Sequence, residues 1–409
     1  MIKPLNVIVA GAGIGGLAAA IQLARLGHAV TILEQAPAPA PVGSGFVLQP
    51  VGLAALADIG LADQILTLGH PISRMIGRTA SGRVVLDAHY DVRPGAGQPG
   101  QFGLAVQRAA LFELLHRAAL GAGVVIRHNA IVASATHKPM PRVHLNNGEA
   151  LECNLLIDAL GLRSPLSGAP PRTLPYGAIW GLFDLPSDSP FQAELLEQRY
   201  ERARRMAGVL PVGTSPTDAT PRAAYFWSIR RDQIDAWHAA PIESWKHDAL
   251  SLWPETAPLL AQVQSHKDMT VALYRHRTHA HPVEGRMIHL GDSWHATSPQ
   301  LGQGANMALL DAAALGIALA RAPHLDEALG DYRARRAAHI AIYQTASRMF
   351  TPFYQSDSRI LPLIRDYIAA PLSRTAVGRK LISQLVAGKI GRPLMHVGLR
   401  DVAGDGGAV

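Results

Sequence analysis

The sequence predicts an α/β protein in which an α/β domain is interrupted by a mainly antiparallel β-sheet and followed by a helical C-terminal segment. Three observations support this fold class. Residues 5–35 read as strand, glycine-rich turn, helix and strand. Residues from about 172 to 275 concentrate Trp, Tyr and Phe in alternating segments, as in a sheet. Residues 322–397 carry their apolar positions mainly at helical spacing.

The composition is that of a folded protein with a large apolar core. The chain has 409 residues, enough for roughly two or three domains, and 48% of them are hydrophobic, with a mean hydropathy of +0.11. Its 38 basic and 31 acidic residues give a net charge of +7, which favours acidic small molecules as partners or loose attraction to polyanions. The basic residues are scattered, so we expect no nucleic acid binding.

Cysteine content and apolar runs bear on location and on metal binding. Cys153 is the single cysteine, so no internal disulfide can form and a cytoplasmic location is expected. No Cys/His spacing typical of a metal site is present, and we expect no bound metal. No uninterrupted run reaches the roughly 18 apolar residues of a membrane span, so stable membrane insertion is not expected.

The glycine-rich turn near the N-terminus has the spacing of a dinucleotide-binding loop. Gly11, Gly13 and Gly16 satisfy G-x-G-x-x-G between a strand and a helix, with Ile14 and Gly15 opening that helix. The three motif glycines provide a tight turn, close approach to a pyrophosphate and close helix–strand packing. The helix N-terminus offers free N–H groups and a positive dipole end to phosphates. We therefore predict a Rossmann-type nucleotide-binding domain.

An acidic residue ends the second strand of this unit. Glu34 lies 18 positions after Gly16, where its carboxylate can accept hydrogen bonds from ribose hydroxyls. A carboxylate there repels a 2′-phosphate, so the sequence favours FAD or NAD over NADP in this pocket. An ordinary glycine turn is the alternative interpretation.

A second glycine-containing motif follows a buried strand late in the chain. The strand 286–291 delivers Asp292 to its carboxyl end, where ligands gather in open α/β sheets. Pro299 stiffens the following loop, and Gly302 and Gly304 expose backbone N–H groups before an apolar helix. Asp292 could bind the hydroxyls of a ribityl chain, or it could simply cap a turn.

The stretch 291–312, GDSWHATSPQLGQGANMALLDA, resembles a known signature. It is similar to the G-D-x-x-H-x-x-x-P-x-x-G-x-G-x-N-x-x-x-x-D-A motif of the FAD-dependent aromatic hydroxylases, the para-hydroxybenzoate hydroxylase-like (group A) flavoprotein monooxygenases. The two glycine motifs lie about 280 residues apart, as in that family, and the resemblance extends over roughly residues 5–320. It implies that both motifs bind the two ends of one FAD.

Position by position, the resemblance implies a set of FAD contacts. Asp292 matches the aspartate on the ribityl chain, and Pro299 the proline beside the isoalloxazine ring. The residues implied for the adenosine and pyrophosphate end are Gly11, Gly13, Ile14, Gly15, Gly16, Glu34, Gln35 and Arg108. The residues implied for the flavin end are Gly43, Ser44, Gly45, Asp158, Gly161, Asp292, Pro299, Leu301, Gly302, Gly304, Ala305 and Asn306.

The chain departs from the family pattern in its middle motif. The family usually has G-A-D-G-x-x-S, whereas residues 158–164 read DALGLRS, with Leu160 in the place of the aspartate. Asp158 lies two positions earlier, and alternate strand residues share a face, so it could partly substitute. Gln35 and Val51 also differ from residues common in the family. These differences concern the nicotinamide donor more than FAD.

The resemblance implies an FAD-dependent monooxygenase acting on an aromatic or polyketide-like small molecule. NADH or NADPH would bind transiently and reduce FAD, and dioxygen would give a flavin C4a-hydroperoxide that hydroxylates the substrate. Epoxidation and Baeyer–Villiger oxidation by the same fold are alternatives. A flavin-binding protein without nicotinamide-driven turnover is another, because of the altered middle motif.

The aromatic segments supply candidate substrate contacts. Tyr176, Trp180, Tyr225 and Trp227 are the candidates, with Arg230 available for an acidic group. Ordinary sheet packing is the alternative for each aromatic residue. The candidate catalytic residues are Pro299, His295 and Tyr225, where His295 could be a general base or a structural neighbour of the flavin.

These patterns divide the chain into six segments. The FAD-binding domain takes 1–71, 104–172 and 276–321; the substrate domain takes an excursion at 72–103 and the sheet at 173–275; a helical C-terminal region takes 322–409. Residues 349–390 mix apolar and basic positions at helical spacing. They could pack on the core, cap the active site, form a dimer surface or touch an anionic membrane. We expect a monomer or a homodimer.

Overall fold

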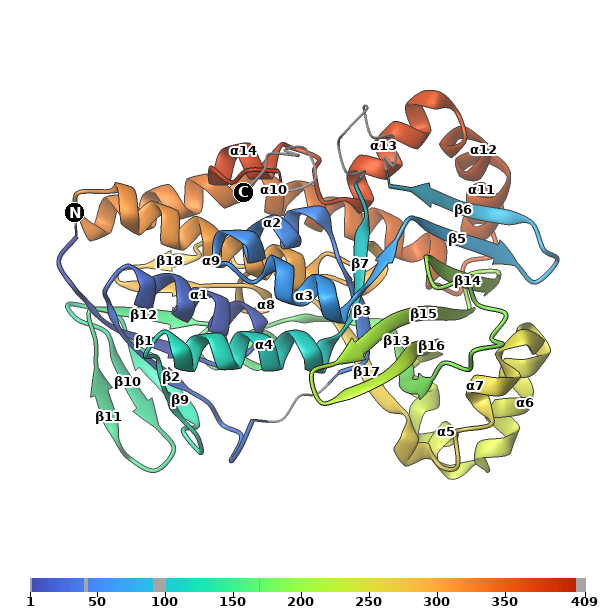
Figure 1. The fold of residues 1–409 in the computed structure, drawn as a ribbon, viewed down its shortest axis with the longest axis horizontal. Helices are drawn as coiled ribbons and strands as arrows, with labels where there is room; N and C mark the ends of the chain where they lie inside the picture. The colour runs from blue at the N-terminus through green and yellow to red at the C-terminus, as the bar shows by residue number, and fades with distance from the viewer. Residues whose placement is uncertain (1, 40–42, 91–100, 169, 402–409) are drawn as a thin grey trace.

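A six-stranded, mostly parallel sheet forms one half of the molecule. The computed structural model describes residues 2–39, 43–90, 101–168 and 170–401. The strand order is β18-β19-β12-β1-β2-β8, so the N-terminal strand lies in the middle of the sheet (Figure 1). The strands are β1 (Asn6–Ala10), β2 (Ala29–Leu33), β8 (Val125–Arg127), β12 (Leu155–Asp158), β18 (Val283–Glu284) and β19 (Met287–His289). This arrangement confirms the predicted α/β class.

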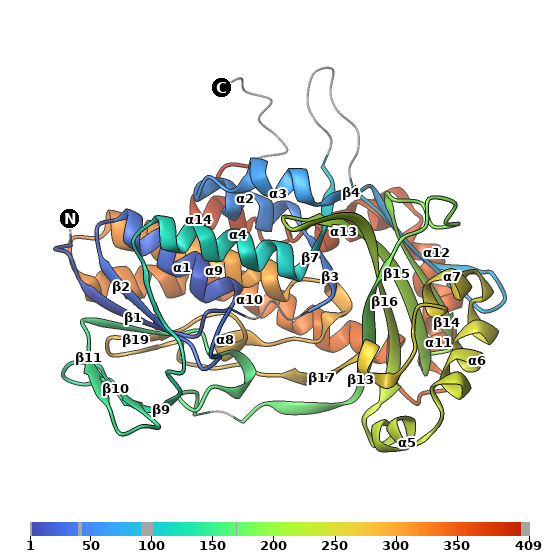
Figure 2. The same ribbon diagram turned by 60° about the horizontal axis from the view of Figure 1, so that its bottom comes forward.

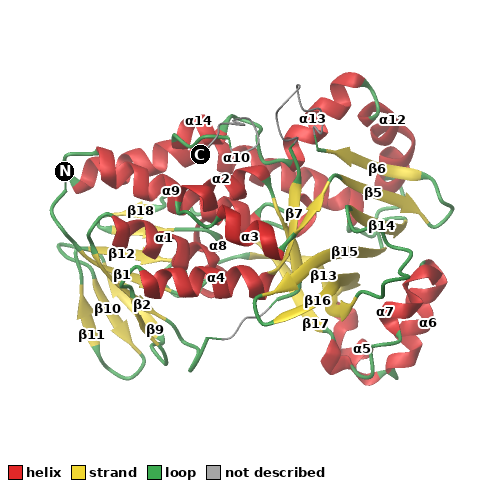
Figure 3. Ribbon diagram, in the orientation of Figure 1, coloured by secondary structure: helices red, strands yellow, loops and turns green. Residues whose placement is uncertain are grey.

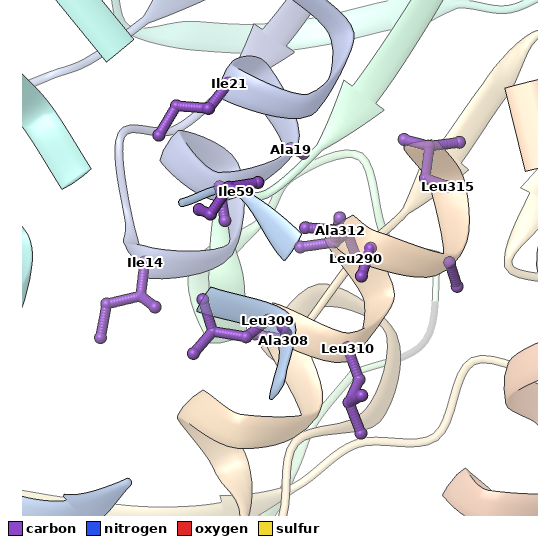
Figure 4. Close-up of a cluster of buried hydrophobic side chains, with 14 of the residues drawn as sticks. Ile14, Ala19, Ile21, Ile59, Leu290, Ala308, Leu309, Leu310, Ala312 and Leu315 are labelled. Atoms are coloured by element: carbon purple, nitrogen blue, oxygen red, sulfur yellow. The ribbon is translucent and has the colours of Figure 1, made fainter. Parts of the chain in front are cut away.

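Helices cover one face of this sheet, and a small antiparallel sheet covers the other. The helices are α1 (Ile14–Arg25), α2 (Pro50–Asp58), α3 (Ala62–Leu68), α4 (Arg108–Gly121) and α9 (Gly304–Arg321). Figure 4 shows α1 and α9 packed through Ile14, Leu309 and neighbouring apolar side chains. The small sheet contains β9 (Val132–Thr136), β10 (Arg142–Leu145) and β11 (Ala150–Glu152).

Helix α9 is long and apolar enough, by length and composition, to cross a membrane. In the structure it packs against α1, α2 and the long helix α10 (Leu325–Tyr354). Most of its side chains are buried inside the protein. We therefore assign it as a core helix, whose apolar character reflects packing on every side.

A seven-stranded sheet forms the other half of the molecule, with strand order β17-β13-β16-β15-β14-β5-β6 (Figure 3). Its pairs are antiparallel except β14 with β5. The strands are β5 (Arg74–Thr79), β6 (Val84–His89), β13 (Arg172–Asp184), β14 (Leu195–Glu201), β15 (Arg205–Ser215), β16 (Asp218–Arg230) and β17 (Thr270–His276). A short sheet of β3 (Gly45–Leu48), β7 (Gly103–Gln107) and β4 (His70–Ile72) lies between the two halves.

The excursion at 72–103 therefore adds two strands, β5 and β6, to the sheet formed by the later aromatic segments. This placement is compatible with the six-segment division, which we retain as a proposal. Residues 91–100 of the excursion lie outside the described residues. One face of the sheet is covered by α5 (Ile234–Ala239), α6 (Ile242–Leu252) and α7 (Ala257–Leu260), as Figure 2 shows.

The C-terminal region is helical, as expected. After α10 come α11 (Leu361–Ile364), a π-helical turn (Arg365–Ala369), α12 (Ala370–Ser373), α13 (Ala376–Val386) and α14 (Pro393–Val397). Helices α10 and α14 pack on α9. In contrast, the stretch 360–381 leaves large apolar side chains exposed, including Ile360, Tyr367 and Val377. Packing on the core thus describes only part of this region, and residues 402–409 lie outside the described ones.

Candidate active site

The three motif glycines have the distinct roles expected from their spacing. Gly11 has φ +104°, and a Cβ atom there would lie 2.6 Å from the carbonyl oxygen of Ala159. A Cβ on Gly16 would lie 2.1 Å from the Gly11 carbonyl oxygen, so only glycine permits this helix–strand contact. Gly13 is exposed, and a Cβ there would meet nothing within 4 Å. Gly11 and Gly16 thus serve the turn and the packing, while Gly13 leaves an open face for a ligand.

The start of α1 is suited to an anion. The helix begins at Ile14 with no acidic residue in its first turn, so its N–H groups and dipole are not neutralised by the chain. Gly15 packs inward, where a Cβ would lie 2.5 Å from Cδ2 of Leu290. The open side above Gly13 is therefore where a pyrophosphate fits.

Glu34 lies beside this helix start in a fixed orientation. Its two carboxylate oxygens accept hydrogen bonds from the backbone N–H groups of Ala12 and Ala36, each at 2.9 Å. Each oxygen has a second lone pair available for a ribose hydroxyl. Glu34 borders a cavity of about 200 Å³ whose other lining residues are Ala12, Gly13, Ile14, Ala36, Ala38, Pro39, Arg108, Phe112, His116 and His128. Gln35 is exposed and does not line it.

Helix α4 contributes a wall of this cavity that the motif did not indicate. Arg108 begins the helix, and Phe112 and His116 follow at four-residue steps, so the three share one face. The rings of Phe112 and His116 stack with centroids 5.8 Å apart, and burial lowers the pKa of His116. The spacing after Arg108 was the signal in the sequence that could have revealed these residues.

The second half of the site is built around Asp292, the first residue of α8 (Asp292–His295). Its side chain is exposed, yet desolvation by the surrounding protein raises its pKa. Arg108 and Arg277 act electrostatically on it, which places it near the start of α4. Gly304 lies close by, since a Cβ there would be 4.0 Å from Oδ1 of Asp292.

The loop after Asp292 presents bare backbone to the same region. Pro299 and Leu301 bound a short 3-10 helix, and Gly302 closes it with φ +62°. Helix α9 then begins at Gly304, followed by Ala305, with no acidic residue in its first turn. Its N–H groups can therefore stabilise negative charge on a ligand at this end.

The side chain of Asn306 is structural. It is fully buried, accepts from the N–H of Gln49 at 2.8 Å and donates to the carbonyls of Val47 and Gly302. Asn306 thus ties the start of α9 to the segment after β3, and only its backbone remains a candidate for ligand binding.

Residues 43–45 link the two halves of the site. Gly43 packs on Arg108, where a Cβ would lie 2.2 Å from Cδ, and the Ser44 carbonyl accepts from the N–H of Arg108 at 2.8 Å. A Cβ on Gly45 would lie 2.1 Å from Cγ1 of Val212 in β15. Gly43 and Ser44 therefore hold Arg108 in place between the cavity and Asp292.

Asp158 does not take the place of the missing motif aspartate. It is fully buried, and its carboxylate accepts from the N–H of Leu160, from the hydroxyl of Ser164 at 2.7 Å and from His289 at 2.7 Å. Because these contacts occupy it inside the protein, we withdraw Asp158 as a cofactor contact. Gly161, in contrast, lies beside Asp292, since a Cβ there would be 3.9 Å from the Asp292 Cβ.

His295 is also structural, which argues against its assignment as a catalytic base. Its Nε2 atom lies 2.6 Å from Oδ2 of Asp311, and both side chains are buried. Asp311 also accepts from Nε of Arg336 at 2.7 Å and from the N–H of Gly291 at 2.9 Å. Burial alone would raise the pKa of Asp311, but the charges of His295 and Arg336 lower it strongly.

The register of the seven-stranded sheet sorts the aromatic candidates onto opposite faces. Trp180 pairs with Phe226, whereas Trp227 pairs with Ile179 and Tyr225 with Gly181. Residues directly opposite each other share a face, so Trp180 and Phe226 lie on one side. Tyr225 and Trp227 lie on the other side and are buried against α5–α7. Their burial favours the alternative of ordinary sheet packing, so we withdraw both residues as substrate contacts and Tyr225 as a catalytic residue.

The remaining sheet candidates have different surroundings. The hydroxyl of Tyr176 donates to Asp357 at 2.7 Å, and Arg230 forms ion pairs with Asp357 and Asp232. Arg230 is therefore not free to bind an acidic substrate. Trp180 is partly buried on the face where Leu182 and Ala224 pack toward β3 and β7. Of the four aromatic candidates, Trp180 stays a candidate substrate contact.

Gln49 is a candidate that the sequence patterns did not indicate. It is fully buried, and its Oε1 accepts from the Tyr90 hydroxyl at 2.6 Å. Its Nε2 has no hydrogen-bond partner in the structure and lies near Gly302, where a Cβ would be 3.6 Å away. A buried donor needs an acceptor, so Nε2 fits a carbonyl group of the bound flavin.

The family model described as "FAD binding domain" matches residues 4–346, which contain both halves of the site. The chain belongs to this family. FAD fits the residues of this site. Gly13 and Glu34 lie at the adenosine end, and Asp292 and the N-terminus of α9 lie at the flavin end.

The names of similar proteins agree with this family. A probable 2-heptyl-3-hydroxy-4(1H)-quinolone synthase of Rhodococcus erythropolis is 28% identical, over 91% of this chain and 92% of the relative. The 6-hydroxynicotinate 3-monooxygenase of Bordetella bronchiseptica is 28% identical, over 83% and 90%. An FAD-dependent monooxygenase of Arthrinium sp. is 30% identical, over 84% and 83%. The chain is therefore an FAD-dependent monooxygenase.

Solved structures show the same fold. The Klebsiella pneumoniae protein HpxO, solved with FAD and uric acid, matches with a TM-score of 0.78 and 20% identity, over 95% of this chain and 98% of that one. The tetrameric form of 2-methyl-3-hydroxypyridine-5-carboxylic acid oxygenase matches with a TM-score of 0.78 and 19% identity, over 99% and 100%. The predicted inserted sheet and helical C-terminal region are thus part of a shared architecture.

Proposed function

We propose that this enzyme hydroxylates an uncharged, planar aromatic nitrogen heterocycle, with electrons from NADH or NADPH. The observation that carries this proposal is the apolar sheet face beside the flavin half of the site. Trp180, Leu182, Ala224 and Phe226 share this face, and Arg230, the candidate cation for an acidic substrate, is already paired. An uncharged ring gains from apolar burial there, whereas a carboxylate would be desolvated without a partner.

The names of the relatives support a ring that contains nitrogen. The relatives in Rhodococcus and Bordetella are named for a quinolone and a hydroxynicotinate, and the solved HpxO structure holds uric acid. Hydroxynicotinate carries a carboxylate, which the pairing of Arg230 disfavours here. Between these classes, we propose a quinolone-like substrate.

The residues of this chain would bind, orient and shield the reactants. FAD, when bound, supplies hydride acceptance and oxygen activation. The N-terminus of α9 would stabilise negative charge at the flavin end, while Asp292 would accept hydrogen bonds from the ribityl hydroxyls. The apolar sheet face would exclude water, and Trp180 would stack on the substrate ring.

The proposal is tested by turnover with a substrate panel. The purified holoenzyme is mixed with NADH or NADPH and a 2-alkyl-4-quinolone, 6-hydroxynicotinate or a simple phenol. We expect the quinolone to stimulate nicotinamide oxidation most, with a product heavier by one oxygen atom. Stimulation by 6-hydroxynicotinate alone would contradict the uncharged-substrate proposal. A ring-expanded or epoxide product would favour the alternative oxidations of the same fold, and the absence of flavin reduction by either nicotinamide would favour a flavin protein without nicotinamide-driven turnover.

We further propose a cytoplasmic location and a monomeric or homodimeric state. The single cysteine, Cys153, is buried, which fits a reducing compartment. Cell fractionation tests the location, and sedimentation of the holoenzyme tests the assembly, where a tetramer would contradict the proposed state.

A further inference from the structure

A second group of chemically capable side chains lies at the edge of the six-stranded sheet. His279, Glu284 and His289 come from three successive segments, and one potential ligand atom of each lies within 4.8 Å of the others. His289 ends β19 and is fully buried, His279 is almost buried, and Glu284 ends β18. The sequence spacing did not indicate a metal site, but the pairing of β18 with β19 brings these residues together.

The hydrogen bonds of His289 determine which of its nitrogen atoms is available. Its Nδ1 lies 2.7 Å from Oδ2 of Asp158, so Nδ1 carries the proton that the carboxylate accepts. Its Nε2 is buried and has no hydrogen-bond partner in the structure. With the proton on Nδ1, Nε2 carries a bare lone pair, and Oε1 of Glu284 lies 3.9 Å from it.

A bare imidazole nitrogen and a carboxylate oxygen repel each other unless a cation lies between them. A shared proton needs a donor–acceptor distance of roughly 2.7–3.2 Å, and 3.9 Å is too long. A tetrahedral metal ion with bonds of about 2.0–2.2 Å places two of its ligands about 3.3–3.6 Å apart. The His279–Glu284 separation of 3.4 Å lies in that range, and the His289–Glu284 separation of 3.9 Å is slightly wider, so a bound ion would draw these two side chains together.

We propose that His279, Glu284 and His289 bind a divalent metal ion of the zinc class. Two imidazole nitrogens and one carboxylate oxygen are ligands that zinc prefers, and Asp158 orients His289 as carboxylates do behind many metal-bound histidines. Nδ1 of His279 accepts a 3.2 Å hydrogen bond from the N–H of His281. Metal binding moves the His279 proton to Nδ1 and ends this contact.

The bound ion would add a cross-link between segments that the pairing of β18 with β19 already brings together. It would hold the stretch before β18 to the last residue of β19, and Asp158 would extend the connection to the end of β12. The 3-10 turn after Asp158 includes Gly161, which lies beside Asp292. The metal ion would therefore have a structural role next to the flavin half of the site, and its ligands are separate from the residues that would hold FAD.

Zinc binding by the holoenzyme tests this proposal directly. The protein is dialysed against EDTA, returned to metal-free buffer and titrated with Zn²⁺ against a chromogenic chelator, with metal content measured by elemental analysis. We expect about one tightly bound zinc per chain. Glu284→Gln and His279→Ala should each reduce this to less than about a tenth, and Asp158→Asn should weaken affinity roughly 10- to 100-fold.

His281→Ala is the matched control, because His281 is an exposed histidine next to the site that offers only its backbone to His279. It should retain full zinc binding. Flavin content, read from the visible spectrum, reports whether each variant is folded. Native protein that binds no zinc, or variants at 279 and 284 that bind it as tightly as the native chain, would overturn the proposal without affecting the monooxygenase assignment.

Discussion

His295 and Asp311 form a buried hydrogen bond of 2.6 Å between α8 and α9, directly behind the loop that would hold the flavin end of FAD. Arg336 from α10 bonds the other oxygen of Asp311 at 2.7 Å, and all three side chains are almost inaccessible. The histidine and the second aspartate of the motif thus hold two helices and the Gly291 turn together. This relationship makes a strong prediction about stability.

Asp311→Asn should destabilise the protein by about 3–5 kcal/mol, because it leaves the charge of Arg336 buried without its partner. The matched control is Asp331→Asn, which breaks a partly exposed ion pair with Arg335 within α10, the helix that also carries Arg336. That change should cost less than about 1 kcal/mol. Urea unfolding of both variants measures the difference, and equal costs would contradict the buried role of Asp311.

The pH dependence of stability should follow the lowered pKa of Asp311. A carboxyl group with a depressed pKa in the folded state stabilises the protein above its unfolded pKa, about 3.9, and this stability is lost as pH falls below that value. The native protein should therefore lose stability steeply below about pH 4. In Asp311→Asn this loss should be shallower. Parallel acid-unfolding curves for the two proteins would refute the assignment.

Ionised Asp292 should lower the stability of the apoprotein, whereas ionised Asp311 raises it, since desolvation raises the pKa of Asp292. An aspartate with a raised pKa costs the folded apoprotein stability once it is ionised, so Asp292→Asn should raise the Tm of the apoprotein at pH 7. The same change should weaken FAD binding roughly 10- to 100-fold, because a charged acceptor is lost. Flavin fluorescence titration measures this affinity, with the exposed Asp326→Asn as the control. Unchanged FAD affinity would remove Asp292 from the site.

Gly13 and Gly16 should fail in different ways when they are replaced. Gly16→Ala places Cβ 2.1 Å from a carbonyl oxygen, so it should lower the Tm sharply with or without FAD. Gly13→Val meets open space, so the apoprotein should keep its native Tm while FAD affinity falls by at least about tenfold. Calorimetry of apo and flavin-loaded protein separates the two effects. A Gly13→Val apoprotein that unfolds early would contradict the open face assigned here.

Trp180 and Trp227 provide a matched pair of aromatic residues on opposite sheet faces. Trp180→Ala should raise the KM for the aromatic substrate by roughly tenfold or more while flavin content and Tm stay near native. Trp227→Ala should instead cost about 3–5 kcal/mol of stability, because it leaves a cavity against α5–α7. Steady-state kinetics and urea unfolding of both variants decide this. A loss of stability in Trp180→Ala together with a raised KM in Trp227→Ala would contradict the roles assigned to the two sheet faces.

Much of this molecule was predictable because two motifs carry strong physical constraints. The tight contacts at Gly11 and Gly16 admit only glycine, and the residue pattern around them is correspondingly specific. Asp292 follows a buried strand, so its place at the sheet edge also follows from the sequence. These motifs predicted the fold class, the cofactor and the reaction type, and the structure and the similar proteins confirmed them.

The errors arose where function depends on pairing between distant segments. Tyr225 and Trp180 both occupy alternating positions, but only the strand register decides which face each takes. His295 and Asp158 bear reactive side chains, but Asp311 and His289 engage them from 16 and 131 residues away. No local pattern encodes those partners, so polar residues near a motif were read as ligands when they are internal supports.

The central position of β1 has a consequence for biosynthesis. Its neighbour β12 begins at Leu155, and the aspartate and helix start at the flavin end follow only after residue 290. A ribosome must therefore make about three quarters of the chain before the two ends of the FAD site can meet. By residue 158 the glycine loop can pack on β1, β2, β8 and β12, but the flavin end of the site is still missing. The complete FAD site therefore forms late in the synthesis of each new molecule.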